Sequence, residues 1–453
     1  MQIVMLVIAL LTAVFAGWNI LRLVSFKRAG ALPAEELLTA YGLGIGAISL
    51  QMLLFYFLNV RYTILTITVP WIALFILNMR SNGTGVRDRL KDGENRPVIE
   101  KLLVLGISLE VAYAFFRALI KPIESYDAVA IYAIKAKIFY LAQSIPSDYF
   151  TRISALYPHP DYPLCIPLAE TFIYTFLGSF NDQLVKMIFP LFFVGILGML
   201  YFAVRRFASR AYALLFTFLL ASIPQFNSYA ANAYQDLPLA YYYFVSAIFL
   251  FRWMEDRSRS QYLVVSAVMA GLAGWTKNEG MMYCVVNTAV IFVFALLDTG
   301  GRSWKTVRSL AVYLSIIFVI MFPWTWIKKT SGIVNGEIEL ANLNPSNMLK
   351  QIYKIVPIFY EFQKQFFGPK KWNILFPAAA FIMILNYKKL FQGTGKYIFI
   401  SLALSVAGYC VFYMISLVEI NYFLSKTWSR FLIHFLPVLV YYLATLLKED
   451  VKL

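Results

Sequence analysis

Two carboxylates, Glu124 and Asp127, stand three residues apart directly after an apolar run, in the stretch ESYDAVAIYAIKAK. Burying an ion beside hydrocarbon costs several kcal/mol unless it is paired or hydrated, so such residues often mark a site. Asp127 opens a segment of helical character and is therefore either a helix cap or a general base. Lys135 and Lys137 in the same stretch either line an interfacial helix or steer an anionic substrate.

Four prolines stiffen a second polar stretch, YPHPDYPLCIPLAE at residues 157–170, which presents His159, Asp161 and Glu170. The prolines fix the backbone, so this stretch is either a rigid turn or a frame for an acceptor or a divalent cation. One histidine and two carboxylates are a weak metal signal, and the sequence specifies no cofactor with certainty.

A third carboxylate, Asp236, stands one residue before an apolar segment that begins with Leu237 and Pro238. This pattern fits an N-cap followed by an early proline, or a functional carboxylate at the membrane surface. Lys277 in GWTKNEG and Arg430 in TWSRFLIHFLP stand at the ends of other apolar segments. They either extend to the lipid headgroups or together clamp a phosphate.

Glu110 lies at the middle of one apolar segment and Lys186 at the start of the next. For Glu110 we expect a hydrogen bond between helices rather than a proton relay. Lys186 is a further candidate for binding the phosphate of a donor.

The elements that position these residues must be membrane helices. Hydrophobic residues make up 60% of the 453 residues and aromatic ones 17%, and the mean hydropathy is +0.67, which excludes an ordinary soluble domain. Repeated apolar runs match the roughly 20 residues that cross a bilayer as a helix, and nothing alternates as in a membrane barrel. We therefore predict an all-α, polytopic integral membrane protein.

About thirteen membrane-spanning helices are expected by this criterion. They lie near residues 2–22, 37–58, 62–79, 101–121, 184–204, 210–225, 237–253, 260–275, 281–297, 308–327, 372–387, 396–416 and 431–447. Threaded alternately, they place the short basic loops on one face, which the positive-inside rule assigns to the cytoplasm. The first run has no basic leader, so we expect it to be retained, with its N-terminus outside.

The opposite, extracytoplasmic face receives residues 122–183, 226–236, 276–280, 328–371 and 417–430. The two long loops, 122–183 and 328–371, are aromatic and punctuated by proline, which predicts interfacial helices. Residues 80–100 form the clearest internal boundary. They separate three N-terminal helices with a basic cytoplasmic loop (1–100) from the remaining module (101–453).

Composition also excludes several classes of function. The net charge of +16 is dispersed over short loops instead of forming a stripe, so nucleic acid is not an expected partner. The three cysteines are far apart and suggest neither a disulfide framework nor a zinc site. With two histidines in the chain, catalysis must depend mainly on Asp, Glu, Lys and Arg.

The order of four motifs resembles the GT-C superfamily of membrane glycosyltransferases. HPDYPLCIPLAETFIYTFLG, YQDLPLAYYYFVSAIFL, GLAGWTKNEG and SRFLIHFLPVLVYYLA are similar to the dolichyl-phosphate-mannose protein mannosyltransferase and aminoarabinose transferase branch, over residues 101–447. The resemblance implies an inverting transfer of a sugar from a polyprenyl-monophosphate carrier to an acceptor outside the cytoplasm.

The resemblance also implies roles for particular residues. Asp127 matches the catalytic aspartate of the first large loop and Asp236 the second outer carboxylate, while Lys277 and Arg430 match positions near the lipid phosphate. Two features depart from the family. The paired acids of the first loop are here Glu124 and Asp127 instead of neighbours, which leaves open which is the base, and three extra helices precede the module.

The chemistry of the residues agrees with this implication. An acceptor hydroxyl needs a carboxylate within hydrogen-bond reach, and a departing phosphate needs its charge offset. The chain has no Gly-rich nucleotide fingerprint or DxD motif, which favours a lipid-linked donor over a sugar nucleotide.

Two alternatives compete with this interpretation. A transporter or flippase of lipid-linked glycans would show internal repeats and broken helices at the midplane. An O-antigen polymerase or ligase would use a lipid diphosphate and loops richer in arginine and histidine. The sequence specifies neither the sugar nor the acceptor, whether glycan, lipid or protein. The expected location is a bacterial inner membrane, with the site facing the periplasm.

Overall fold

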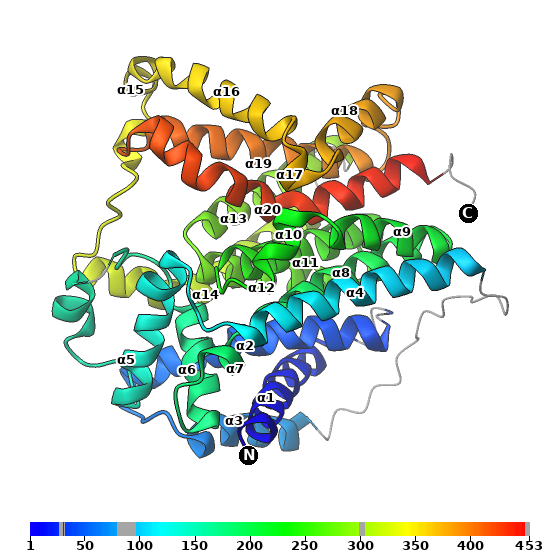
Figure 1. Cartoon of the computed structure of the whole chain (residues 1–453). Coiled ribbons are helices and arrows are strands. Elements are labelled where there is room, and N and C mark those ends of the chain that lie inside the picture. The colour runs from blue at the N-terminus through cyan, green and yellow to red at the C-terminus, as the bar shows by residue number, and fades with distance from the viewer. Residues whose placement is uncertain (27–29, 31, 79–96, 157, 299–303, 449–453) are drawn as a thin grey trace.

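The structure is a computed structural model, and it describes residues 1–26, 30, 32–78, 97–156, 158–298 and 304–448 (Figure 1). Helices dominate these residues, and the β-pairing found among them is an isolated bridge between Ile338 and Ser416. The predicted all-α fold class is confirmed. Most of the predicted boundary at 80–100 lies outside the described residues.

Nine helices of the described chain are long and apolar enough to cross a membrane. They are α1 (Gln2–Leu23), α2 (Pro33–Phe57), α4 (Val98–Ile120), α7 with α8 (Asp182–Val185 and Ile188–Arg205), α11 (Asp236–Glu255), α13 (Glu279–Asp298), α14 (Trp304–Thr330), α19 (Gly395–Ile415) and α20 (Ile420–Leu447). The chain is thus an integral membrane protein.

The other four predicted spans are also helical but only 11 to 17 residues long. They are α3 (Ile64–Asn78), α9 (Arg210–Ala221), α12 (Ser260–Thr276) and α18 (Leu375–Leu385). At 1.5 Å per residue, even 17 residues cover about 26 Å, slightly less than the hydrocarbon core of a typical bilayer. Length alone therefore does not identify these four as full spans.

Short helices fill the two long loops, as predicted. They are the π-helices η2 (Ala128–Ala133) and η3 (Tyr149–Ile153), the 3₁₀ turns η4 (Ser154–Leu156), η5 (Leu340–Leu343) and η6 (Ile352–Lys354), and α5 (Ile134–Ala142), α6 (Cys165–Leu177), α15 (Pro345–Lys350), α16 (Ile355–Phe366) and α17 (Pro369–Trp372). One more short helix, α10 (Pro224–Tyr229), precedes α11.

The helix α6 departs from the expectation of an interfacial position. Twelve of its thirteen residues are buried, and it packs against α2 and α5. By contrast, α16 packs against α20 and leaves Phe359 and Tyr360 exposed, which fits a helix at the membrane surface. The prolines of residues 157–170 thus lead into a helix inside the protein.

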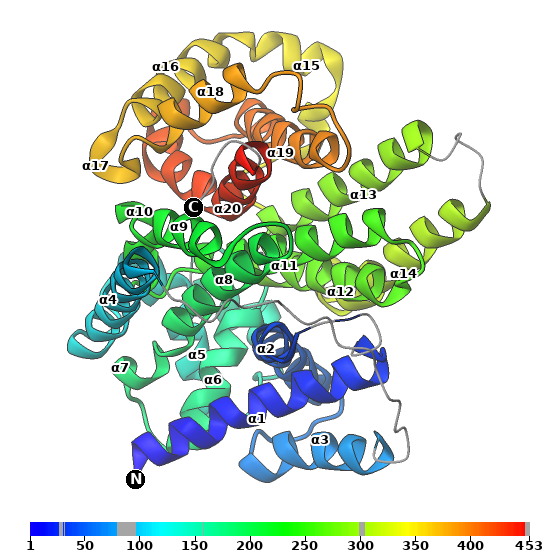
Figure 2. The same ribbon diagram turned by 90° about the vertical axis from the view of Figure 1, so that its right-hand side faces the viewer.

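Helix α11 is the centre of the fold. Figure 2 shows it surrounded by α8, α12, α20 and α2, and all its residues from Asp236 to Met254 are buried. Each hydroxyl of its three consecutive tyrosines finds a partner: Tyr241 donates to the Leu38 carbonyl, Tyr242 to the Gly42 carbonyl, and Tyr243 bonds Ser401. These aromatic residues therefore serve packing.

The intramembrane carboxyl group of Glu110 is hydrogen-bonded between helices, as predicted. Asn227 of α10 donates its side-chain amide to Glu110 Oε2 at 2.8 Å and to the Glu110 carbonyl oxygen at 3.3 Å. The contact fixes α10, which lies next to the start of α11, against α4.

A buried ion triad ties α2 to the centre of the fold at the end of α11 that is remote from Asp236. Glu35 is fully buried and accepts from Arg206 Nη2 at 2.7 Å and from Arg252 Nη2 at 2.6 Å. Helix α2 also packs against α6, α8, α11 and α12. Helices α1 and α2 therefore share a core with the rest of the described chain, and a separate role for the first hundred residues remains a prediction from sequence.

We expect Glu35→Gln to lower the free energy of unfolding by about 3 kcal/mol or more, because it removes the buried charge that pairs with the buried Arg252 and with the partly exposed Arg206. The measurement is the midpoint of thermal unfolding of the detergent-purified protein. Asp256→Asn is the matched control, because Asp256 pairs with Arg259 on the surface, where such a pair is worth about 1 kcal/mol at most. Equal shifts for the two variants would contradict the assigned role of Glu35.

Candidate active site

Four of the predicted site residues, which come from four distant segments, meet in one cluster. Asp127 directly precedes the π-helix η2, and Asp236 is the first residue of α11. Lys277 lies in the extended break between α12 and α13, and Arg430 lies within α20. Residues separated by more than 300 positions in sequence are thereby in direct contact.

Asp236 is the hub of this cluster and is fully buried. Its Oδ1 lies 3.0 Å from Lys277 Nζ and 2.9 Å from His434 Nε2. Its Oδ2 accepts from Arg430 Nη2 at 3.1 Å and from Nε at 3.3 Å. These bonds with cationic and imidazole groups offset the cost of burying the carboxylate.

Arg430 joins Asp236 to Asp127. Its Nη1 donates to Asp127 Oδ2 at 2.5 Å, and its guanidinium group lies 4.8 Å from the centre of the Tyr234 ring. The Asp127 side chain is 24% exposed, whereas that of Asp236 is completely buried. Asp127 makes no capping hydrogen bond to the helix that follows it, so the capping alternative finds no support in the structure.

The position of Arg430 differs from the sequence prediction. The last span was expected to begin at residue 431, but α20 begins at Ile420, which places Arg430 about three turns inside the helix. His434 follows it four residues later, on the same face of the helix. That spacing was the signal that could have identified His434, which sequence analysis did not select as a site residue.

Further polar groups surround the cluster. Glu279 is a second residue of the site that sequence analysis did not select. Its Oε1 lies 2.8 Å from Lys277 Nζ, while its buried Oε2 has no hydrogen-bond partner within the described chain. The hydroxyl of Tyr132 is likewise buried and unpaired there. Burial raises the pKa of this phenol well above its usual value, and Arg430 opposes the shift. Unpaired buried polar atoms of this kind are candidates for contact with a ligand or water.

His434 links the cluster to two tyrosines. Its Nδ1 lies 2.5 Å from the Tyr409 hydroxyl, which lies 3.0 Å from the hydroxyl of Tyr283. All three residues are buried. The imidazole is thus held at both nitrogens, so its orientation toward Asp236 is fixed.

The Pro-rich stretch contributes a neighbouring group. Asp161 Oδ2 accepts from the side chain of Asn278 at 2.6 Å, and Asn278 is the residue after Lys277. His159 Nε2 lies 3.9 Å from Glu337 Oε1, and Lys135 donates to the His159 carbonyl oxygen at 2.9 Å. Burial lowers the pKa of His159 and raises that of Asp161. Burial also lowers the pKa of Lys135 to about 8.

The other predicted residues lie apart from this cluster. Glu124 is exposed and pairs with Lys121 at 2.9 Å, a hydrogen bond that lowers its pKa. Lys186 donates to the Pro122 carbonyl at 3.1 Å and lines a separate surface pocket with Glu124. Of the two acids in the first loop, the structure therefore brings Asp127 to the cluster.

Lys137 and Glu170 are also occupied elsewhere. Lys137 pairs with Asp182 at 2.9 Å. Glu170 is fully buried in α6, and neither of its carboxyl oxygens has a hydrogen-bond partner within the described residues. Over the described ranges, no group of three or more His, Cys, Asp and Glu side chains is arranged to hold a metal ion.

An apolar groove of about 530 Å³ adjoins the cluster. It is lined by α16, α18, α19 and α20, and its wall includes Tyr409 and Phe431. Both residues also touch the cluster, because Tyr409 bonds His434 and Lys277 lies 5.8 Å from the centre of the Phe431 ring. A charged site and an apolar groove therefore share two aromatic side chains.

Glu337 provides a pH-dependent test of this region. Burial, reinforced by Glu279, raises the pKa of Glu337 to about 7. A carboxyl group with a raised pKa in the folded state destabilises the protein as pH rises from the unfolded value toward the folded value. We expect the free energy of unfolding to fall by about 2 kcal/mol between pH 4.5 and 7. Glu337→Gln should remove this part of the pH dependence of stability.

The measurement is the unfolding midpoint of wild type and Glu337→Gln at pH 5 and pH 8. Glu339→Gln is the control, since Glu339 is an exposed acid two residues away. A pH dependence that persists unchanged in Glu337→Gln would refute the assignment.

Residues 159–327, which include Asp236 and Lys277, match the family model described as dolichyl-phosphate-mannose-protein mannosyltransferase. The structure of ArnT from Cupriavidus metallidurans bound to undecaprenyl phosphate matches with a TM-score of 0.51 and 17% identity, over 78% of this chain and 61% of that chain. The apo structure of the same ArnT matches with a TM-score of 0.50 and 18% identity, over 79% of this chain and 61% of that chain.

An oligosaccharyltransferase from Archaeoglobus fulgidus matches at a TM-score of 0.47 and 13% identity, over 76% of this chain and 48% of that one. No curated protein sequence gives a significant match. The chain spans 61% of the length of the ArnT chains it resembles.

Proposed function

We propose that the chain is an inverting glycosyltransferase related to the protein mannosyltransferase and ArnT branch of the GT-C superfamily. The family-model match over residues 159–327 and the fold shared with ArnT support this proposal. The enzyme moves a sugar from a polyprenyl-monophosphate carrier to an acceptor hydroxyl. The reaction takes place at the extracytoplasmic face of the membrane, in bacteria the periplasmic face of the inner membrane.

The observation that carries this proposal is the bridge that Arg430 makes between Asp127 and Asp236 beside the apolar groove. A glycosyl transfer from a lipid phosphate requires a base, a cationic phosphate site and an apolar path for the lipid. The cluster supplies the first two, and the groove supplies the third.

Asp127 acts as the general base. Its Oδ2 is held by Arg430, while no hydrogen bond engages its Oδ1 among the described residues, and the side chain is accessible. The acceptor oxygen attacks the anomeric carbon as its proton passes to Asp127. The bond from that carbon to the phosphate oxygen breaks, and the electron pair leaves with the polyprenyl monophosphate. A single displacement of this kind inverts the anomeric configuration.

Lys277 and Arg430 bind the departing phosphate. Both cations are paired with carboxylates, but an ammonium and a guanidinium group carry three and five N–H donors, so some remain for a phosphate oxygen. Asp236 positions both cations from its buried site. The lipid chain occupies the groove, and the structure of ArnT bound to undecaprenyl phosphate supports this class of donor.

We assign His159 and Asp161 to the acceptor side of the site, on the basis of their contacts with Asn278 and Glu337 next to Lys277. Lys135 supports this segment through the His159 carbonyl. Lys186, Lys137 and Glu124 lie outside the cluster, and any role in donor binding would be at the approach to it.

The decisive experiment compares donors. Purified protein is incubated with radiolabelled polyprenyl-monophosphate sugars and with the corresponding diphosphates, together with total lipid and glycan extracts as acceptors. Consumption of the monophosphate with transfer of the sugar supports the proposal. Consumption of the diphosphate alone would identify a polymerase or ligase, and bound donor without turnover would indicate a transporter.

The groove gives a further prediction. We expect Ala403→Phe, which fills the groove from α19, to raise KM for a long polyprenyl donor about tenfold and to change kcat much less, because it removes lipid binding alone. A donor with a short prenyl chain should show little change. Ala112→Phe on the exposed face of α4 is the control, and an equal effect of both variants would argue against the groove as the lipid site.

A further inference from the structure

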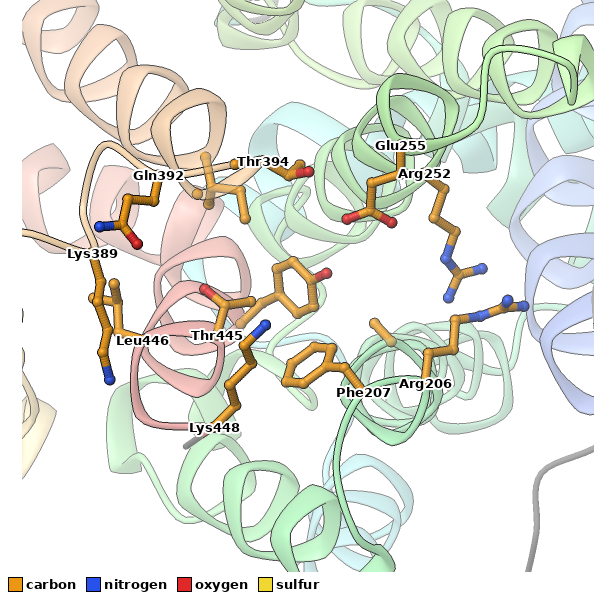
Figure 3. A pocket seen from close by; sticks show the side chains of 15 residues that line it. Arg206, Phe207, Arg252, Glu255, Lys389, Gln392, Thr394, Thr445, Leu446 and Lys448 are labelled. Atoms are coloured by element: carbon orange, nitrogen blue, oxygen red, sulfur yellow. The ribbon is translucent and has the colours of Figure 1, made fainter. Parts of the chain in front are cut away.

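A second cavity, of about 370 Å³, lies at the other end of the molecule. The last turns of α8, α11 and α20 and the start of α19 surround it (Figure 3). Helix α11 begins at Asp236 in the candidate active site and ends at Glu255 beside this cavity, so its 20 residues separate the two by roughly 30 Å. This end carries the basic loops that predict a cytoplasmic face.

The cavity borders on a buried guanidinium group that is not fully hydrogen-bonded within the described chain. Arg206 and Arg252 both line it and share the single carboxylate of Glu35. Arg252 is 7% exposed, and its Nη1 has no hydrogen-bond partner within the described chain. A buried guanidinium N–H of Arg252 therefore lacks an acceptor among the described residues.

Two further features favour an anion in the same space. Figure 3 shows the ammonium of Lys448 directed toward it, and Lys448 forms no ion pair among the residues described. The N-terminal turn of α19, a 21-residue helix, also faces the cavity, and its N-cap Thr394 makes no capping hydrogen bond. The N-terminus of a helix attracts anions through its N–H groups and its dipole.

From these observations we infer that the cavity binds a phosphate group. Its volume lies within the range of small-molecule sites, about 300–1,000 Å³. The guanidinium fork of Arg252 and the ammonium of Lys448 match phosphate oxygens, and they outnumber the one carboxylate, Glu255, that faces the same space. The phosphate belongs either to an anionic lipid headgroup of the adjacent leaflet or to a free phosphate compound in the aqueous phase.

The test uses the full chain in nanodiscs of phosphatidylcholine and two probes. Inorganic phosphate is titrated by calorimetry, and phosphatidylglycerol, added at increasing fractions, is counted by native mass spectrometry. We expect Lys448→Gln to weaken binding about threefold or more. Lys388→Gln is the matched control, because Lys388 is an exposed lysine near the same helix start that does not line the cavity. It should leave binding unchanged.

A second variant separates loss of binding from loss of folding. Thr394→Asp places a carboxylate at the N-cap of α19, which should stabilise the helix while repelling a phosphate, so binding should fall about tenfold at an unchanged or higher unfolding temperature. Binding of phosphate alone identifies a soluble ligand, and binding of phosphatidylglycerol alone identifies a lipid headgroup. Binding of neither probe to the wild type, or equal losses in Lys448→Gln and Lys388→Gln, would overturn the inference.

Discussion

Asp127→Asn is expected to reduce transfer of the sugar by about 10²–10⁴-fold, the usual contribution of a positioned general base. The amide retains the shape of the carboxylate and an oxygen for Arg430, but it cannot take the proton of the acceptor hydroxyl. Donor binding should persist, so kcat should fall far more than KM changes. The measurement is turnover of a labelled polyprenyl-monophosphate sugar by wild type and variant at saturating donor.

Glu124→Gln is the control for this prediction. Glu124 also lies in the first loop but is exposed and paired with Lys121, away from the cluster. We expect its activity to stay within about twofold of wild type, since an exposed pair contributes little. If Glu124→Gln lost the activity and Asp127→Asn kept it, the base would be Glu124, and the geometric assignment would be wrong.

Asp236→Asn is expected to have the largest effect on stability. The substitution removes the buried charge that balances Lys277 and Arg430 and the partner of His434. Removing one member of a buried ion pair costs about 3–5 kcal/mol, because the remaining charge stays desolvated. The unfolding midpoint in detergent should fall accordingly, and transfer should be lost with it.

Asp182→Asn is the matched control for Asp236→Asn. Asp182 also pairs with a lysine, Lys137, but both side chains are partly exposed, so we expect a loss of about 1 kcal/mol. A comparable loss of stability in the two variants would show that Asp236 is not the hub that its contacts indicate.

The same physical reason allowed the fold class and four residues of the cluster to be predicted from the sequence. Burying an ionisable side chain beside the bilayer costs free energy, so few such residues occur at the ends of apolar segments. Those that do occur often mark a functional site. The charge of the intervening loops then assigned Asp127, Asp236, Lys277 and Arg430 to one face. The structure places these four in direct contact, although their chemical roles stay predictions.

The remaining details depend on side-chain direction, which hydropathy does not encode. Glu124 and Asp127 are three residues apart, yet only Asp127 turns inward toward Arg430. Lys135 and Lys137 likewise point to different partners, the His159 carbonyl and Asp182. Lys135 and Lys137 are two residues apart on α5 and therefore point to different sides of it, while the π-helix η2 interrupts the α-helical periodicity between Asp127 and α5.

Helix boundaries were the second source of error. Aromatic and polar residues at 420–430 lower the apolar signal, so the last span was expected to start at 431, whereas α20 begins at Ile420. With that boundary, Arg430 and His434 are one turn apart on one helix. The burial of α6 was not predicted, because its short apolar run lies between prolines and polar residues in a loop where interfacial helices were expected.

The anomeric configuration of the product tests the central claim most directly. A donor of defined configuration is turned over by the purified protein, and the linkage of the product is determined by NMR. Direct attack of the acceptor oxygen, with Asp127 as base, predicts complete inversion. Retention would require a covalent glycosyl-enzyme or an equivalent second displacement, and it would contradict the role proposed here for Asp127.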